Sequence, residues 1–196
     1  MRIILASGSQ RRKDILTEAG LEFEIIKSDK EEIITKTKPD EVVIELSKQK
    51  AQDVCSKVNA SDDYMIIAAD TVVSLDDKIL CKPKDRDDAY NMILSISGRT
   101  HIVYTGVTII ASKNGNSKTM SFEAHTSVSV RDMQDGEINA YIDTDESYDK
   151  AGAYAIQGKF AKFIDKIEGE YNNVVGFPIA KFYKVIQENF LEFDIF

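Results

Sequence analysis

The chain has 196 residues, of which 43% are hydrophobic and 30% are charged, and its formal net charge at pH 7 is -8. This length and composition suit one folded domain with a substantial core, and we treat residues 1–196 as that domain. The acidic balance argues against general nucleic-acid binding, which needs a broad basic face, but it is compatible with a local basic pocket.

The N-terminal part is predicted to contain two strands, two helices and a charged loop. In chain order these are a strand at 2–5, a helix at 10–19, a strand at 23–26, a loop at 28–38 and a helix at 39–58. The first helix has Ile15 and Leu16 on its inner face and Gly20 as a stop signal. The second helix begins at Pro39, a residue that suits the first helical turn.

The rest of the chain is predicted to hold the longest strands. A β-branched run at 65–74 turns back into a short strand at 79–80, and strands at 100–112 and 118–130 flank the turn pair Asn114-Gly115. The remaining segments are helices at 85–95, 135–143 and 178–190, mixed signals at 149–158 and a loop or irregular strand at 167–176. Because helices and strands mix throughout, the predicted class is α/β or α+β with a mixed or largely antiparallel sheet.

The first candidate site is the turn after the first strand, where residues 5–12 read Leu-Ala-Ser-Gly-Ser-Gln-Arg-Arg. Small residues let backbone N–H groups approach an anion, and a helix N-terminus adds unpaired donors and a partial positive charge. Arg11 and Arg12 can add bidentate contacts to phosphate oxygens, so the pattern suits a polyphosphate. The alternative is a plain strand–turn–helix with Ser9 as N-cap and both arginines in solvent.

The second candidate is Asp70, within the run Ile-Ile-Ala-Ala-Asp-Thr-Val-Val. An acid that follows four apolar or small residues is costly to bury without a partner. At a strand position beside a cleft, its carboxylate can bind a metal or accept a proton from water. The alternative is a strand-end aspartate that caps a turn.

Other polar residues carry weaker signals. Glu32 lies in a charged loop, and this pattern predicts a solvent-exposed run of charges. Lys50 is predicted to be a surface lysine of the second helix. Lys82 precedes Pro83, which favours an extended backbone that can aim the ammonium at a cleft, although a surface position is the simpler interpretation.

Two later segments complete the candidates. Residues 149–158 read Asp-Lys-Ala-Gly-Ala-Tyr-Ala-Ile-Gln-Gly, whose small residues permit close backbone approach and whose Gln157 can pair with a base edge. A tightly packed strand or turn with an exposed glutamine is the alternative. Residues 171–178 read Tyr-Asn-Asn-Val-Val-Gly-Phe-Pro and predict a structural turn into the last helix.

The cysteines and the N-terminus point to the cytoplasm. Cys55 and Cys81 lack the spacing of a metal site, so we expect two reduced structural residues. The sequence begins without a signal-peptide pattern, and it has no apolar run of about 18 residues. His101 and His125 are too sparse to suggest a metal site.

Together, six segments resemble the Maf family of nucleoside triphosphate pyrophosphatases. They occur in the family's order at 5–12, 69–73, 82–83, 94–98 with 101–106, 149–158 and 169–178. Residues 149–158 resemble the branch that acts on dTTP and UTP, and differ from the branch that acts on 7-methyl-GTP. Gln10 departs from the pattern, because the family usually has a proline there, and its absence is expected to loosen the loop slightly.

The resemblance implies an α/β fold with a long twisted mixed sheet, flanking helices and two lobes around a deep cleft. It implies hydrolysis of a nucleoside triphosphate to the monophosphate and pyrophosphate, with a divalent metal cation, Mg²⁺ or Mn²⁺. Carried over by position, the roles are catalysis for Asp70, metal binding for Glu32 and Asp70, phosphate binding for Ser7, Arg12, Lys50 and Lys82, and base choice for Arg11, Thr71 and Gln157.

The leading interpretation is therefore a cytoplasmic enzyme for dTTP, UTP or modified pyrimidine nucleotides. The alternative is a regulatory nucleotide-binding protein, linked to cell division, with little turnover. We expect a nucleoside triphosphate as the ligand and neither nucleic acid nor membrane as a partner, and the sequence leaves a homodimer open.

Overall fold

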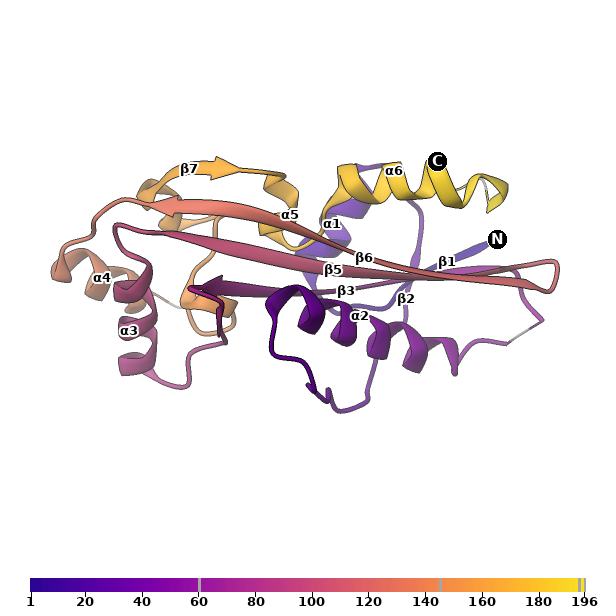
Figure 1. The fold of residues 1–196 in the computed structure, drawn as a ribbon, viewed down its shortest axis with the longest axis horizontal. Helices are drawn as coiled ribbons and strands as arrows, with labels where there is room; N and C mark the ends of the chain where they lie inside the picture. The colour runs from indigo at the N-terminus through magenta and orange to yellow at the C-terminus, as the bar shows by residue number, and fades with distance from the viewer. Residues whose placement is uncertain (60, 145, 194, 196) are drawn as a thin grey trace.

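The fold is built on one mixed sheet that runs along the molecule (Figure 1). The computed structural model describes residues 1–59, 61–144, 146–193 and 195. Within these ranges seven strands pair in the order β2-β1-β3-β5-β6-β7, with β4 beside β3. They are β1 (Arg2–Leu5), β2 (Glu24–Ile25), β3 (Tyr64–Leu75), β4 (Lys78–Leu80), β5 (Thr100–Lys113), β6 (Asn116–Val130) and β7 (Ile164–Glu168).

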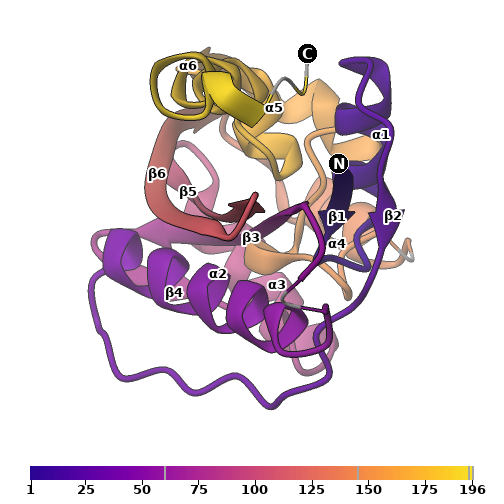
Figure 2. The ribbon, with the colours of Figure 1, turned by 90° about the vertical axis from the view of Figure 1, so that its right-hand side faces the viewer.

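Helices cover both faces of this sheet (Figure 2). One face carries α2, and the other carries α1, α5 and α6, while α3 and α4 gather at the far end of the long strands (Figure 1). The helices are α1 (Gln10–Glu18), α2 (Pro39–Cys55), α3 (Arg86–Ile96), α4 (Asp135–Ile142), α5 (Tyr171–Val175) and α6 (Ile179–Asn189), with 3-10 turns η1 (Ala151–Ala153), η2 (Lys159–Phe163) and η3 (Leu191–Phe193).

The predicted class is confirmed, and the sheet is mixed. β1 pairs in parallel with β2 and β3, whereas the β3–β5, β5–β6 and β6–β7 pairs are antiparallel. The predicted turn between the two longest strands is also confirmed, because Asn114 and Gly115 have φ of 52° and 78°. Positive φ at both central residues matches the right-handed twist of a tight hairpin.

The segment expected as a loop or irregular strand at 167–176 is the clearest error of the sequence analysis. It contains the end of β7 and the short helix α5. Two asparagines and two valines are poor helix formers, so local preference does not explain this helix. The fully buried Asn173 does, because its side-chain amide donates to the Val103 carbonyl at 3.0 Å and to the Thr126 hydroxyl at 3.1 Å.

No helix in the described ranges combines the length and the apolar character needed to cross a membrane. The apolar residues instead form packed clusters on both faces of the sheet. The largest includes Leu16, Ile67, Val107 and Phe182, and a second includes Ile66, Ala68, Ala51 and Val54 on the side of α2.

Helix α2 touches the backbone of the sheet directly at Gly106. A Cβ atom at Gly106 would lie 2.3 Å from the Val43 carbonyl oxygen, so only glycine permits this approach. Gly106 is the cross-strand partner of Asp70 on β3. The contact therefore fixes how far α2 stands from the strand that carries the acid.

Gly106→Ala is expected to lower the free energy of unfolding by about 3 kcal/mol or more, because two backbones must separate to admit one methyl group. Gly136→Ala is the matched control, since Gly136 lies in α4 and a Cβ atom there would meet nothing within 4 Å. That change should be neutral or slightly stabilising. Urea unfolding of both variants tests the contact, and equal stability for the two would contradict it.

Candidate active site

The site lies at a gap in the edge of β3. On this side of β3, β1 pairs with residues 64–67 and β4 pairs with residues 73–75, and no strand among the described residues pairs with 68–72 between them. Successive strand residues point to opposite faces, so Asp70 and Thr71 point away from each other. At an open edge, side chains from both faces of the sheet can reach one cavity.

That cavity has a volume of about 470 Å³, within the range typical of small-molecule sites. Its walls come from α1, α2, β3, β4, the loop before α2, the segment around η1 and the end of α5. The charged and hydroxyl side chains among its lining residues are Ser9, Arg11, Arg12, Glu32, Lys50, Asp70, Thr71, Lys82, Asp149 and Lys150, together with Tyr154.

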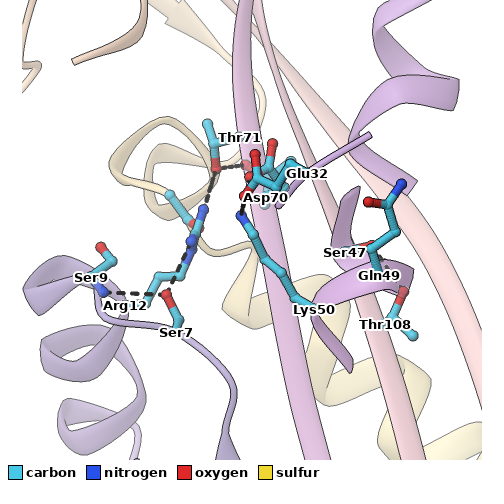
Figure 3. A network of polar contacts seen from close by, with 12 residues as sticks. Ser7, Ser9, Arg12, Glu32, Ser47, Gln49, Lys50, Asp70, Thr71 and Thr108 are labelled. Carbon is cyan, nitrogen blue, oxygen red and sulfur yellow. Dashed lines mark hydrogen bonds and ion pairs between the residues drawn. The ribbon is translucent and has the colours of Figure 1, made fainter. Parts of the chain in front are cut away.

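Arg12 is a cation held by neutral acceptors. Its Nε donates to the Gly176 carbonyl at 2.9 Å, and its two Nη atoms donate to the Ser7 hydroxyl at 3.1 Å and the Thr71 hydroxyl at 3.0 Å (Figure 3). Burial lowers the pKa of the guanidinium, against the opposing effect of the Asp70 and Glu32 charges. An arginine stays charged even so, and one held without a directly paired carboxylate is well suited to an anionic ligand.

The alternative in which both arginines of this turn lie in solvent is therefore wrong for Arg12. Ser9 does occupy the N-cap position of α1, but its hydroxyl makes no capping bond there. The Ser7 hydroxyl instead accepts from the Ser9 backbone N–H at 3.2 Å. The turn thus orients Arg12 across the gap.

On the other face, the Lys50 ammonium lies between two carboxylates. It pairs with Asp70 and, at 3.0 Å, with Glu32 (Figure 3). The side chains of Lys50 and Asp70 are only 17% and 14% exposed. The interpretation of Lys50 as a surface lysine is wrong, because α2 packs so closely on the sheet that this side chain is directed at β3.

The loop that carries Glu32 is fastened to α2. The Gln49 amide pairs with both backbone groups of Ile33, accepting from its N–H at 3.0 Å and donating to its carbonyl at 2.6 Å. The Glu45 carboxylate accepts from the backbone N–H and the hydroxyl of Thr35. Glu32 is 45% exposed, so its loop is solvated as expected, but hydrogen bonds to α2 anchor the loop backbone.

The remaining predicted residues lie at different depths. Arg11 and Lys82 line the cavity, and Lys82 is exposed at its rim. Gln157 is exposed and is not one of the lining residues, although Tyr154 and Ile156 of the same segment are. The sequence analysis gave no role to Lys150, which also lines the cavity and belongs to that segment.

The sequence signal of the cysteines was only partly informative. Both are free, as expected. Cys55 is partly buried beside the Tyr64 hydroxyl, but Cys81 is exposed and lines the cavity instead of packing in the core.

Comparison with known proteins agrees with this architecture. A family model described as Maf-like protein matches residues 2–189. The chain belongs to the Maf family. A dTTP/UTP pyrophosphatase of Thermoanaerobacter sp. (strain X514) is 46% identical over 195 residues, which cover 100% of this chain and 98% of the relative. The proteins of the same name from Agathobacter rectalis and Carboxydothermus hydrogenoformans are 44% and 46% identical, and cover 95% and 96% of this chain and 97% and 98% of theirs.

The residues of this Maf protein fit the divalent cation that its family implies. Glu32 and Asp70 already share one positive charge, the Lys50 ammonium, and carboxylate oxygens are the donors that Mg²⁺ and Mn²⁺ prefer. The described ranges hold no group of three or more His, Cys, Asp or Glu residues arranged for a metal ion. Two carboxylates are enough for Mg²⁺ when substrate phosphates and water complete its coordination.

Tyr154, which lines the cavity, packs against a buried histidine. The His101 Nε2 lies 2.7 Å from the hydroxyl of Tyr154, and the two rings meet edge to face at 5.1 Å. His101 is 1% exposed, and burial lowers the pKa of its imidazole from 6.5 to about 4.

This shift predicts a pH dependence of stability. Between pH 6.5 and about 4 the unfolded chain binds a proton at His101 that the folded protein does not, so the free energy of unfolding falls as the pH falls. The contribution is complete above pH 6.5, and about 3 kcal/mol is lost by pH 4. When the pH is lowered from about 7 to 5, the free energy of unfolding measured in urea should fall less for His101→Gln than for the wild type. Equal losses would assign the effect to other groups.

Proposed function

We propose that this chain hydrolyses dTTP and UTP to the monophosphate and pyrophosphate. The observation that carries the proposal is the pairing of charges in one cavity: a guanidinium held by neutral acceptors faces a lysine and two carboxylates across the gap in β3. This arrangement provides positive charge for a triphosphate and a carboxylate for a water molecule. The names of the relatives support the same reaction.

The triphosphate would be bound by Arg12, Lys50 and Lys82, which come from different elements, with Ser7 acting through Arg12. Arg12 offers a planar fork for two phosphate oxygens, and the Ser7 hydroxyl, which does not line the cavity, accepts from its Nη1. Lys50 and Lys82 would add point charges from α2 and from the residue pair after β4. These charges stabilise the leaving pyrophosphate, whose negative charge grows as the bond to the α-phosphorus breaks.

Asp70 would accept the proton of the attacking water. It lies on the central strand β3, where it pairs with Lys50 until the cation binds. A base placed in line with the α-phosphorus converts a bimolecular encounter into a positioned one. A carboxylate facing a triphosphate is of little use to a site that only binds the nucleotide, so Asp70 favours the enzyme over the regulatory alternative.

Glu32 and Asp70 would hold the divalent cation, Mg²⁺ or Mn²⁺. When bound, the cation would neutralise phosphate charge and polarise the reacting phosphoryl group. Lys50, which contacts both carboxylates, would then be released toward the phosphate oxygens. The anchored loop keeps Glu32 within reach of Asp70 throughout.

Base choice would fall to Arg11, Thr71 and Gln157. Uracil and thymine present an acceptor–donor–acceptor edge, and the Gln157 amide has both a donor and an acceptor to answer it. Gln157 directly follows the cavity-lining Ile156, so the proposal requires its exposed side chain to turn toward the base when the nucleotide binds. Gly152 and Ala153 have positive φ, 69° and 59°, so the segment turns tightly here; Gly152 adopts this conformation without the Cβ clash that Ala153 must accept.

Asp70→Asn is expected to lower kcat by about 10²–10⁴-fold in a folded protein, because an amide cannot accept the water's proton. Asp53→Asn is the matched control: Asp53 is a buried acid of α2, held by Lys57, whose hydrogen bond lowers its pKa to about 2. This control should lose stability and keep its kcat. Pyrophosphate release, coupled to an inorganic pyrophosphatase, and circular dichroism measure the two effects. Retention of more than about half of kcat by Asp70→Asn would contradict the assigned role.

A panel of nucleotides tests the base preference. The kcat/KM for dTTP and UTP should exceed that for CTP, ATP and GTP by about tenfold or more, since each buried polar group left unpaired costs roughly 1–3 kcal/mol. Gln157→Ala should reduce the ratio of kcat/KM between the preferred and the disfavoured nucleotides more than it lowers kcat for dTTP.

The same assay after exhaustive EDTA treatment should show no turnover. A wild-type preference for GTP or 7-methyl-GTP would overturn the assignment, and nucleotide binding without turnover would support the regulatory alternative.

A further inference from the structure

A chain of hydrogen bonds runs from Arg12 into the core. The Thr71 hydroxyl, which accepts from Arg12 at 3.0 Å, lies 2.9 Å from the Thr105 hydroxyl. The Thr105 hydroxyl in turn donates to the backbone carbonyl of Asn173 at 3.1 Å. Thr105 and Asn173 are both 0% exposed, and neither lines the cavity.

Counting the hydroxyl protons shows which group donates in each of these hydrogen bonds. A threonine hydroxyl has one proton and two lone pairs. Two acceptors lie within reach of the single Thr71 proton, the Thr105 hydroxyl at 2.9 Å and the Gly176 carbonyl at 3.4 Å. The shorter contact is with Thr105, whose own proton goes to the Asn173 carbonyl, so Thr71 donates to Thr105 and keeps its lone pairs for Arg12. The Thr71 hydroxyl therefore presents an acceptor toward the guanidinium, and Thr105 keeps the Thr71 hydroxyl in that orientation.

Helix α5, which contains Asn173, also supports Arg12 through a second hydrogen bond. The Asn173 side chain fastens α5 to the Val103 carbonyl of β5 and to the Thr126 hydroxyl of β6. Helix α5 ends at Val175, and the carbonyl of its C-cap residue, Gly176, accepts from the Arg12 Nε at 2.9 Å. Asn173 thus supports both the hydroxyl chain and the carbonyl that Arg12 contacts.

We infer that Thr105 and Asn173 are positioning residues for Arg12, which orient its guanidinium for the phosphates without touching the nucleotide. This inference rests on the proposed function, which assigns Arg12 to the triphosphate. An arginine loses conformational freedom when it binds an anion, and a side chain already held in place loses less. The hydroxyl chain supplies that order while leaving the positive charge unneutralised.

The test uses inorganic pyrophosphate, the product of the proposed reaction, as the probe at a fixed Mg²⁺ concentration. Thr105→Val removes the hydroxyl at nearly constant volume and should weaken pyrophosphate binding by about tenfold in calorimetry. Thr105→Ser keeps the hydroxyl and should bind as the wild type does. Thr108→Val is the matched control, because Thr108 is a threonine of the same strand, 1% exposed, whose hydroxyl contacts Ser47 and Ser121 instead. It should leave the Kd within about twofold.

A double-mutant cycle separates positioning from general damage. Arg12→Lys keeps a charge but lacks the planar fork, so in that background Thr105→Val should weaken binding no further. A loss that persists in the Arg12→Lys background, or an equal loss in Thr108→Val, would overturn the inference. If Thr105→Val does not fold, Thr105→Ala carries the same cycle, because it also removes the hydroxyl behind Thr71. Unchanged binding by Arg12→Lys itself would instead refute the assignment of Arg12 to phosphate, and with it the proposed function.

Discussion

The gap in the edge of β3 is the constraint on which the rest of the site depends. A continuous sheet would keep its two faces apart, since strand residues alternate between them and the backbone closes the space between. Here β1 ends and β4 begins on either side of residues 68–72. The interruption lets a cation from one face and a cation–carboxylate cluster from the other converge on a single cavity.

The two sides of the cavity are stabilised in different ways. On the α1 side, Arg12 is surrounded by hydroxyl and carbonyl oxygens, so its charge is satisfied in hydrogen bonds but not neutralised. On the α2 side, the Lys50 ammonium balances only one of the two carboxylate charges, so this cluster keeps a net negative charge. The first arrangement is prepared for an anion. The second must rearrange when a metal or a phosphate arrives, so the two sides would contribute differently to binding and to chemistry.

Close packing connects the fold to this geometry. Gly106 lets α2 approach the sheet backbone, and that approach brings Lys50 to Asp70 and provides Gln49 and Glu45 as anchors for the loop of Glu32. On the opposite face, the buried Asn173 holds α5 against β5 and β6. Residues far from the cavity in sequence therefore set the positions of those that line it.

The sequence by itself determined the elements whose signals are local. Hydrophobic periodicity, Pro39 and the Asn114-Gly115 turn were enough to predict the long helix and the long hairpin, and the apolar neighbours of Asp70 marked it as an unusual acid. Only the tertiary structure decided that α5 is helical, that Lys50 is buried between carboxylates and that Thr105 lies behind Arg12. The physical reason is that a local pattern reports backbone preference and burial, whereas a polar side chain's partners come from strands and helices up to 164 residues away, as for Arg12 and Gly176.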